Sequence, residues 1–274
     1  MEKVKSVKKK IAIIGGGHIG TALALGLVQS ARVHASQLTV SDPHLQNITR
    51  LKKLGIAVTT DNVLATTNAE WVFLAVKPGS IGGVLKEIKD VTKKRLIISL
   101  AAGVTVEDLR EHTKSSSVFF ARIMPNIPIA HNQGVIGLFG GRISMRDLFQ
   151  LKYVLKGLGF VLEVQNESEL EILTVVSGSG PAVVAYSIDA VANAGQVLGL
   201  SKDTATALAE HTFKGTSAYL EASHVSPQQL MESVATRGGI TEVILTSLKH
   251  SAVRQSFVRA LKQGYVKIKK TRKV

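Results

Sequence analysis

Short apolar runs alternate with amphipathic segments through the first part of the chain. Runs such as Ile11–Ile14 and Trp71–Val76 are continuously apolar, as expected of strands buried on both faces of a parallel sheet. The pattern predicts strands at 10–14, 38–41, 71–76, 95–100, 117–122, 134–138 and 160–164, and helices at 21–29, 44–54, 79–90, 105–112 and 144–157. This alternation predicts an α/β fold, a doubly wound parallel sheet with helices on both faces.

The strand signal ends near residue 167, and only helical spacing follows. Ser226-Pro227-Gln228-Gln229 has the composition of a helix start, with a serine cap, a proline in the first turn and a glutamine three residues after the cap. Helices are predicted at 168–176, 181–199, 203–222, 227–234 and 241–263. We therefore predict two domains, 1–166 with the sheet and 167–274 all-helical, packed closely because no low-complexity linker separates them.

Composition indicates an ordinary globular protein in a reducing compartment. Of 274 residues, 45% are hydrophobic and 20% are charged, which excludes disordered and fibrous classes. The absence of cysteine rules out a disulfide framework and a thiolate metal site. The histidines have no metal-ligand spacing, so we predict no metal. We expect a cytoplasmic protein.

The formal net charge of +14 is concentrated at the two ends of the chain. Residues 1–10 hold five lysines and one glutamate, and residues 266–274 hold five Lys/Arg and no acid. We interpret both ends as solvated, frayed tails, with a nucleic-acid surface as the alternative. No apolar run approaches the roughly 20 residues that cross a bilayer. The apolar part of a signal-like start at Ile11–Ile14 is too short and runs directly into a glycine loop. We therefore expect neither nucleic acid nor membrane as a partner.

A glycine loop, Gly15-x-Gly17-x-x-Gly20, lies between the first predicted strand and the first helix. This context predicts a Rossmann-type dinucleotide site, which the glycine motif alone would not. The first glycine allows the tight turn, the second lets the backbone approach a pyrophosphate, and the third allows close packing of helix on strand. The phosphates would lie at the N-terminus of the helix. The alternative is a glycine-rich turn without a ligand.

Asp42, at the end of the second predicted strand, is 22 residues beyond Gly20. A carboxylate there accepts hydrogen bonds from ribose hydroxyls and favours NAD, because it repels a 2′-phosphate. Ser41, His44 and Arg50 favour NADP(H) instead, since their side chains would suit its 2′-phosphate. The choice between NAD(H) and NADP(H) stays open, as does a simple turn-forming role for the Asp-Pro pair. His18 is interpreted as a loop-packing or phosphate-side residue rather than a catalytic base.

Six segments together resemble pyrroline-5-carboxylate reductase, in the order and spacing of that family and through nearly the whole chain. They are Gly15-Gly16-Gly17-His18-Ile19-Gly20, Phe73-Leu74-Ala75-Val76-Lys77-Pro78, Ser99-Leu100-Ala101-Ala102-Gly103-Val104, Arg122-Ile123-Met124-Pro125-Asn126-Ile127-Pro128, Ser177-Gly178-Ser179-Gly180-Pro181-Ala182 and Val234-Ala235-Thr236-Arg237-Gly238-Gly239-Ile240-Thr241. The resemblance implies hydride transfer from NAD(P)H to the C=N carbon of 1-pyrroline-5-carboxylate, giving L-proline.

The resemblance also implies which residues meet the cofactor. The glycine loop residues Gly15, Gly17, His18, Ile19 and Gly20 would hold the phosphates, with Ser41, Asp42 and Asn62 near the adenosine. The nicotinamide wall would be formed by Ala75, Val76, Lys77, Pro78, Ala101, Met124 and Asn126. Such a crevice at the carboxyl ends of parallel strands is also where the fold by itself predicts a ligand.

By the same resemblance, the substrate would lie against Thr236, Gly238, Gly239, Thr241 and Ser177. Backbone N–H groups at a glycine pair opening a helix suit a small carboxylate. Thr236 would add a hydroxyl to that carboxylate, and Thr241 would hydrogen-bond the ring nitrogen as the imine becomes an amine. The alternative for this loop is an ordinary helix start capped by Thr241, and that for 177–181 is a tight corner between helices.

This sequence departs from the family pattern at three positions. Arg237 stands where proline is common, Ile240 replaces the first of two threonines, and His18 replaces a residue that is more often asparagine. Arg237 would add charge near the carboxylate or point to solvent. The departures bear on substrate affinity and identity rather than on the fold.

The apolar stretch 183–197 is too extensive for one face of a helix and indicates burial against another helix. The resemblance implies homodimers, and rings of dimers in many members, built through the helical domain. Three other functions stay open. They are a related Rossmann reductase of another imine or ketone, a non-catalytic dinucleotide-binding regulator, and a nucleic-acid-binding protein with salt-sensitive binding through its basic ends.

Overall fold

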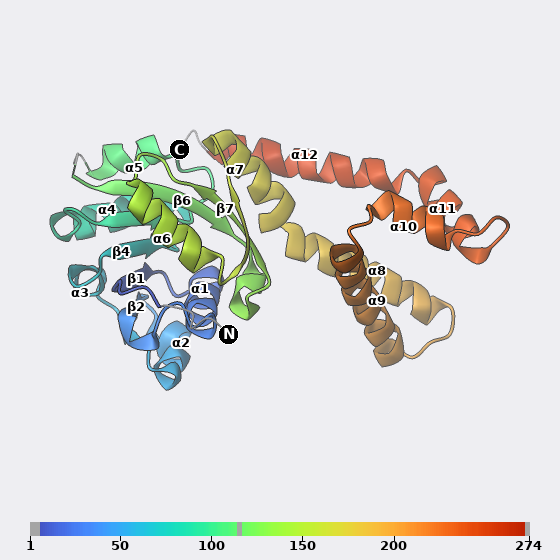
Figure 1. Cartoon of the computed structure of the whole chain (residues 1–274), viewed down its shortest axis with the longest axis horizontal. Coiled ribbons are helices and arrows are strands. Elements are labelled where there is room, and N and C mark those ends of the chain that lie inside the picture. The colour runs from blue at the N-terminus through green and yellow to red at the C-terminus, as the bar shows by residue number, and fades with distance from the viewer. Residues whose placement is uncertain (1–5, 114–116, 272–274) are drawn as a thin grey trace. The chain divides into compact units, whose positions relative to one another are not determined.

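The computed structural model describes residues 6–113 and 117–271. Within these ranges, one eight-stranded sheet has the strand order β3-β2-β1-β4-β5-β6-β7-β8 (Figure 1). Its strands are β1 (Ile11–Ile14), β2 (Leu38–Ser41), β3 (Ala57–Thr59), β4 (Trp71–Leu74), β5 (Leu96–Ser99), β6 (Phe119–Pro125), β7 (Gly134–Phe139) and β8 (Gly159–Glu163). The order reverses direction between β1 and β4, and this reversal is the topological switch point at which such sheets bind ligands.

The sheet is parallel except for one pair, β6 and β7, which run antiparallel with Met124 opposite Gly137. The sequence pattern predicted parallel pairing throughout. Parallel neighbours need a long crossover, whereas only the short helix Ile127–His131 and a left-handed residue, Asn132, connect these two strands. The chain therefore returns beside β6 in the opposite direction.

Both faces of the sheet are covered by helices, as predicted (Figure 1). In β1, Ile11 and Ile13 belong to one buried cluster with Leu23 of α1, whereas Ala12 and Ile14 belong to another. Side chains alternate between the two faces of a strand, so a continuously apolar strand serves both clusters. The first cluster also takes in α6, and the second takes in α4 and α5.

The helices of the sheet region largely follow the predicted ranges. They are α1 (His18–Gln29), α2 (Leu45–Ile48) continued by the 3₁₀ helix Thr49–Leu54, α3 (Asn62–Thr67), α4 (Ile81–Ile88), α5 (Val106–Thr113), α6 (Met145–Leu155) and α7 (Glu167–Leu173). Short 3₁₀ helices also occur at Ala35–Gln37, Pro78–Ser80 and Lys89–Val91. β3 and α3 were not predicted, because elements this short carry no measurable periodicity.

The remaining helices are α8 (Gly180–Val197), α9 (Lys202–Ser223), α10 (Pro227–Val234), α11 (Ile240–His250) and α12 (Val253–Thr271). The predicted start of α10 is confirmed, because Ser226 and Gln229 form a reciprocal capping box. The single helix predicted at 241–263 is wrong, since the chain turns at Ser251 and Ala252, the latter with φ of 52°. The frayed tails predicted at 1–10 and 266–274 are wrong within the described residues. Gln37 donates to the carbonyl oxygens of Val7 and Lys9, and α12 continues to residue 271. Residues 1–5 and 272–274 of the predicted tails lie outside the described residues.

The segment Ser177–Pro181, interpreted above as a possible corner, is helical. A π-helical turn, Thr174–Gly178, joins α7 to α8, so that helical conformation runs from Glu167 to Val197. This joined helix is long and apolar enough to cross a membrane by length and composition alone. The pattern along the chain predicted two shorter helices there, because glycines destabilise a helix interior.

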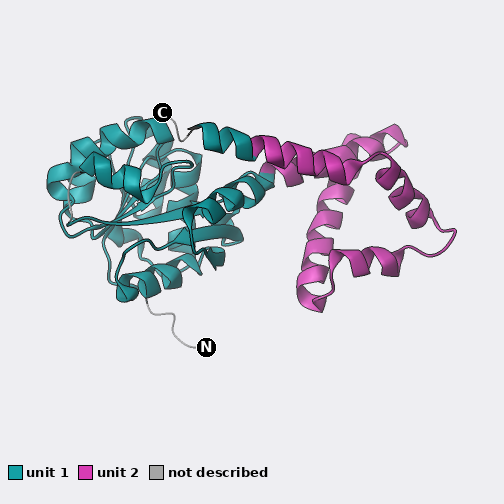
Figure 2. Cartoon of the chain, turned by 90° about the horizontal axis from the view of Figure 1, so that it is seen from above, with its two compact units in different colours: residues 1–181, 265–274 teal, residues 182–264 magenta. Residues whose placement is uncertain are grey.

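The chain forms two compact units, 1–181 with 265–274 and 182–264 (Figure 2). In the second unit, a small buried cluster joins α8 to α9 through Ala192, Ala205 and Ala209. Large apolar side chains remain exposed there, among them Tyr186, Val197 and Leu198, the last at 86%. The domain division 1–166 and 167–274 stays a prediction.

Candidate active site

The glycine loop has the geometry that a dinucleotide requires. Gly15 has φ of 105°, and a Cβ atom there would lie 2.5 Å from the carbonyl oxygen of Ala75. A Cβ atom on Gly20 would lie 1.9 Å from the carbonyl oxygen of Gly15, so this glycine lets α1 pack tightly on the loop. At Gly17 a Cβ atom would meet nothing within 4 Å. The loop is therefore crowded where it must turn and open where a phosphate would approach the helix.

Asp42 is turned toward the glycine loop and is nearly buried. Its Oδ2 accepts a hydrogen bond from the Gly16 amide at 2.7 Å. Its Oδ1 accepts from the His44 amide at 2.9 Å and from Nδ2 of Asn47 at 3.1 Å. Both carboxylate oxygens are thus engaged within the protein, and the carboxylate fixes the loop against the end of β2.

A cavity of about 470 Å³ opens in front of the loop. Arg50 and the predicted residue His18 line it, together with the side chains or backbone of Gly16, Gly17, Thr21, Gln46 and Asn47. Gln46 and Asn47 were not among the predicted site residues, although the predicted helix at 44–54 places 46, 47 and 50 on one face. The cavity is therefore polar and carries a guanidinium group suited to an anion.

Two further predicted residues, Ser41 and Asn62, lie in contact. The Ser41 hydroxyl donates to Oδ1 of Asn62 at 2.8 Å, and Nδ2 of Asn62 donates to Oε2 of Glu87 at 2.8 Å. Glu87 was not predicted, because it lies on α4, far along the chain from either residue. The Asn62 side chain is thus held from both sides at the end of β2.

The predicted nicotinamide wall lies at the ends of three adjacent strands, β4, β5 and β6. The Ala75 amide donates to Ile14 at 2.8 Å, which continues the ladder between β4 and β1. Ala101 is buried directly after β5, and Met124 is buried in β6. Lys77 and Pro78 begin the 3₁₀ helix Pro78–Ser80, and Val76 is half-buried. The fold thus brings the three predicted segments to one edge of the sheet.

Asn126 links this edge to the π-helical turn. Its Nδ2 donates to the carbonyl oxygen of Ser177 at 3.0 Å, and its Oδ1 accepts from the Val135 amide at 2.8 Å. The Ser177 hydroxyl in turn donates to the carbonyl oxygen of Leu173 at 2.8 Å. Single π-helical turns are frequent at functional sites, since they re-aim the side chains and carbonyls around them.

The predicted substrate loop lies in the second unit, directly before α11. The Gly238 amide donates to Oε2 of Glu242 at 2.6 Å, and the Gly239 amide donates to the carbonyl oxygen of Thr236 at 2.9 Å. Both glycine amides that were predicted to receive a carboxylate therefore already have acceptors. Glu242, which the sequence analysis passed over, occupies one of them with a carboxylate of its own. Thr241 is half-buried in the first turn of α11.

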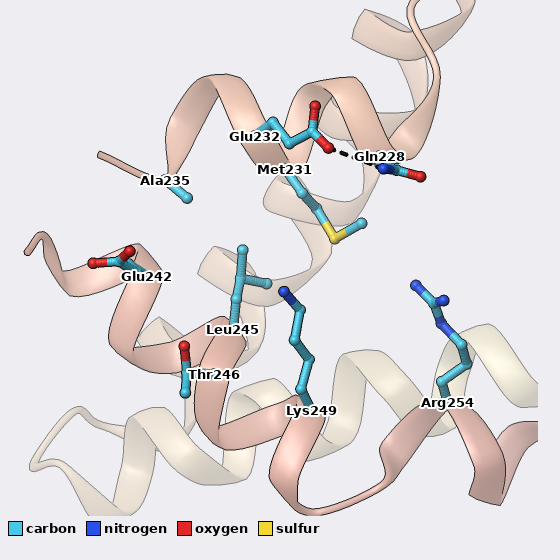
Figure 3. Close-up of a pocket in the computed structure, with 9 residues that line it drawn as sticks. All are labelled: Gln228, Met231, Glu232, Ala235, Glu242, Leu245, Thr246, Lys249 and Arg254. Carbon is cyan, nitrogen blue, oxygen red and sulfur yellow. Dashed lines mark hydrogen bonds between the residues drawn. The ribbon is translucent and has the colours of Figure 1, made fainter. Parts of the chain in front are cut away.

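A cavity of about 500 Å³ lies beside this loop, within the second unit (Figure 3). Its lining comes from α10, α11 and the start of α12, and comprises Gln228, Met231, Glu232, Ala235, Glu242, Leu245, Thr246, Lys249 and Arg254. Oε1 of Glu232 accepts a hydrogen bond from Nε2 of Gln228 at 2.9 Å. Within residues 6–113 and 117–271, no group of three or more His, Asp or Glu side chains gathers as a metal site would require.

A Rossmann sheet whose glycine loop is open at Gly17 defines the class of dinucleotide-binding proteins. The comparisons agree with this class and resolve the family. Residues 10–103 match the family described as NADP oxidoreductase coenzyme F420-dependent, and residues 167–271 match the family described as pyrroline-5-carboxylate reductase dimerisation.

The chain is 34% identical over 256 residues to the pyrroline-5-carboxylate reductase of Corynebacterium melassecola, covering 91% of this chain and 94% of the relative. The solved pyrroline-5-carboxylate reductase of Coxiella burnetii superposes with a TM-score of 0.87 at 31% identity, covering 96% and 98% of the two chains. The solved pyrroline carboxylate reductase of Plasmodium falciparum with NADP bound has a TM-score of 0.89 at 26% identity, covering 97% and 99% of the two chains. The chain belongs to the pyrroline-5-carboxylate reductase family. It is an NAD(P)H-dependent oxidoreductase, as predicted.

Proposed function

We propose that this protein reduces 1-pyrroline-5-carboxylate to L-proline with these residues as its site. The observation that carries the proposal is the convergence at one sheet edge of the open glycine loop and the three strand ends of the predicted wall. When bound there, NAD(P)H supplies the hydride for the C=N carbon. The protein's part is to bind, orient and supply polar partners.

On the cofactor side, each group of residues has a distinct task. Gly15 and Gly20 permit the turn, and the backbone at Gly17, His18 and Ile19 faces the phosphates at the start of α1. Ala75–Pro78, Ala101, Met124 and Asn126 form one wall of the nicotinamide site. Orientation of two reactants accounts for a large part of catalysis in reactions that need no strong acid.

On the substrate side, the carboxylate binds at the glycine pair Gly238–Gly239 with the hydroxyl of Thr236, and it displaces Glu242 from the Gly238 amide. Thr241 hydrogen-bonds the ring nitrogen as it becomes an amine. Ser177 contributes from the π-helical turn. An imine nitrogen is readily protonated, so hydroxyls and backbone amides suffice for this chemistry.

We further infer that NADPH is the preferred cofactor. Asp42 is engaged by the Gly16 and His44 amides, so its carboxylate does not project into the cavity as a ribose acceptor that would repel a 2′-phosphate. Arg50 lines the cavity in front of the loop and supplies a cation for that phosphate. Ser41 is buried and donates to Asn62, so it holds the Asn62 side chain at the same end of the cofactor site.

The protein self-associates through its helical region in this proposal, as a homodimer or a ring of dimers. The exposed apolar side chains of Tyr186, Val197 and Leu198 support burial against a second copy. Burial against a second copy would also explain why the helix at 167–197 is so apolar, and no membrane is needed to cover it. We place the protein in the cytoplasm, with no nucleic-acid partner.

The test follows NADPH and NADH absorbance with 1-pyrroline-5-carboxylate for wild type and Thr241→Ala. We expect rapid oxidation by the wild type and a kcat lower by about 10²-fold in the variant, the usual scale for a positioned proton-transfer partner. Cofactor affinity should be unchanged, and Thr241→Ser should recover part of the rate. Ser247→Ala, on the same helix, is the control.

The outcomes separate the reaction from the residue. A wild type that binds NADPH but leaves this imine untouched would refute the substrate, and other cyclic imines and ketones would then be assayed. An active wild type with an equally active Thr241→Ala would refute the role of the threonine alone.

A further inference from the structure

Arg122 is a buried charge in the middle of β6. Its side chain is only 1% exposed, as complete a burial as that of the apolar residues around it. A buried guanidinium is costly unless it is paired, and an apolar side chain of similar volume often serves stability as well or better. Its presence in a sheet core therefore calls for an explanation beyond packing.

The guanidinium of Arg122 joins elements that are distant in the sequence. Nη1 pairs with Oε1 of Glu167, at the start of α7, at 2.7 Å. Nη2 donates to the carbonyl oxygen of Ala101, directly after β5, at 3.2 Å. Oε1 of Glu167 also accepts from the Val106 amide, at the start of α5, at 2.9 Å. The paired side chains of Arg122 and Glu167 thus fix the two ends of the loop between β5 and α5, Arg122 at Ala101 and Glu167 at Val106.

The same face of β6 carries a residue of the proposed nicotinamide wall. Side chains two apart on a strand point to the same side, so Met124 lies beyond Arg122 on this face. Met124 packs in a buried cluster with Leu170 of α7 and with Ala102. Arg122 anchors the backbone of the loop at Ala101, and Met124 packs against Ala102, the residue that follows.

We propose that Arg122 is a positioning residue for hydride transfer, acting through the carbonyl group of Ala101. The assignment rests on the proposed function, since Ala101 matters to the reaction only as part of the nicotinamide wall. Arg122 holds the Ala101 carbonyl while Glu167 orients the guanidinium. The loop then presents a fixed surface to the nicotinamide. This matters because a small displacement of a reactant lowers the rate of the reaction substantially.

The test uses Arg122→Lys in the full-length chain. Lysine keeps the positive charge for Glu167, but its single ammonium group does not reproduce the fork that reaches both Glu167 and Ala101. We expect kcat to fall about tenfold or more, with the NADPH dissociation constant within about threefold of wild type. With NADPH deuterated at the transferred position, the isotope effect on kcat should rise, because hydride transfer becomes slower relative to other steps.

Arg95→Lys is the matched control. Arg95 also donates to backbone carbonyl groups, those of Val91, Ala69 and Thr67, but at the opposite end of β5. The Arg95→Lys variant should therefore show the same isotope effect on kcat as the wild type. If Arg122→Lys does not accumulate as folded protein, Glu167→Gln decides, since glutamine keeps an acceptor for the Val106 amide while removing the charge that orients Arg122.

An Arg122→Lys protein that folds and matches Arg95→Lys in kcat and isotope effect would overturn the positioning role. If Arg122→Lys does not fold, a folded Glu167→Gln protein with the kcat and isotope effect of the wild type would overturn the positioning role as well. If the wild type itself does not reduce the imine, both the proposed function and the role of Arg122 fail. The wild-type assay therefore distinguishes failure of the proposed function from failure of the Arg122 role alone.

Discussion

The Gly16 amide donates a hydrogen bond to Oδ2 of Asp42 at 2.7 Å, at a buried position between the first and second strands. This contact changes the role expected of the acid at the end of β2. In many dinucleotide-binding sheets, a carboxylate at this position accepts hydrogen bonds from the ribose hydroxyls and rejects a 2′-phosphate. Here it organises the glycine loop, which we propose receives the phosphates.

The first prediction follows from that contact. Asp42→Ala should weaken binding of NADH and NADPH alike, by about 1.5–3 kcal/mol, the range for losing hydrogen bonds to a charged group. Titration of both cofactors measures the effect. A selective gain in NADPH affinity would instead mean that the carboxylate faces the 2′-phosphate, and our account of Asp42 would be wrong.

The second prediction concerns the cation in the cavity. Arg50→Ala should raise the dissociation constant for NADPH about tenfold and that for NADH little, because only NADPH offers a phosphate for a charge-assisted hydrogen bond. Lys53→Ala is the control, since Lys53 lies on the same 3₁₀ helix but does not line the cavity. Equal losses for the two cofactors would argue against phosphate recognition by Arg50.

The third prediction separates two glycines of one loop. Gly20→Ala should both destabilise the fold and abolish cofactor binding, because its Cβ atom would lie 1.9 Å from the Gly15 carbonyl oxygen. Gly17→Ala should fold with little change in Tm, since nothing lies within 4 Å of its Cβ position, yet bind cofactor weakly. Thermal unfolding with and without NADPH tests both. Normal NADPH binding by Gly17→Ala would contradict the assignment of the phosphate site.

The fourth prediction addresses the carboxylate already present in the substrate loop. Oε2 of Glu242 lies 2.6 Å from the Gly238 amide, where we propose that the substrate carboxylate binds. Glu242→Gln should lower the KM for 1-pyrroline-5-carboxylate a fewfold, because it removes a competing negative charge while keeping a hydrogen-bond acceptor. Glu221→Gln, on α9, controls for net charge. A raised KM would mean that Glu242 supports the loop rather than competes for it.

Much of the fold followed from the spacing of residues along the chain. The strands Ile11–Ile14, Leu38–Ser41, Trp71–Leu74 and Leu96–Ser99 and the capping box at Ser226 were predicted because each depends on neighbours within a few residues. The glycine loop was found for the same reason. Two of the failures were equally local in origin: β3 was too short to carry a signal, and the glycines at 178 and 180 concealed a helix that stays continuous through a π-helical turn. The antiparallel pairing of β6 and β7 was missed because it is a property of the sheet topology.

The sequence by itself determined the class of fold, the dinucleotide loop and, through six motifs in register, the family. Only the tertiary structure decided where the polar groups of the site direct their hydrogen bonds. Asp42 turns inward to Gly16, Glu242 turns back to Gly238, and Arg122 reaches Glu167 and Ala101. Periodicity and motifs record which residues are adjacent along the chain. A buried polar group is satisfied by whichever partner folding brings within about 3 Å, and that partner is set by the packing of whole elements.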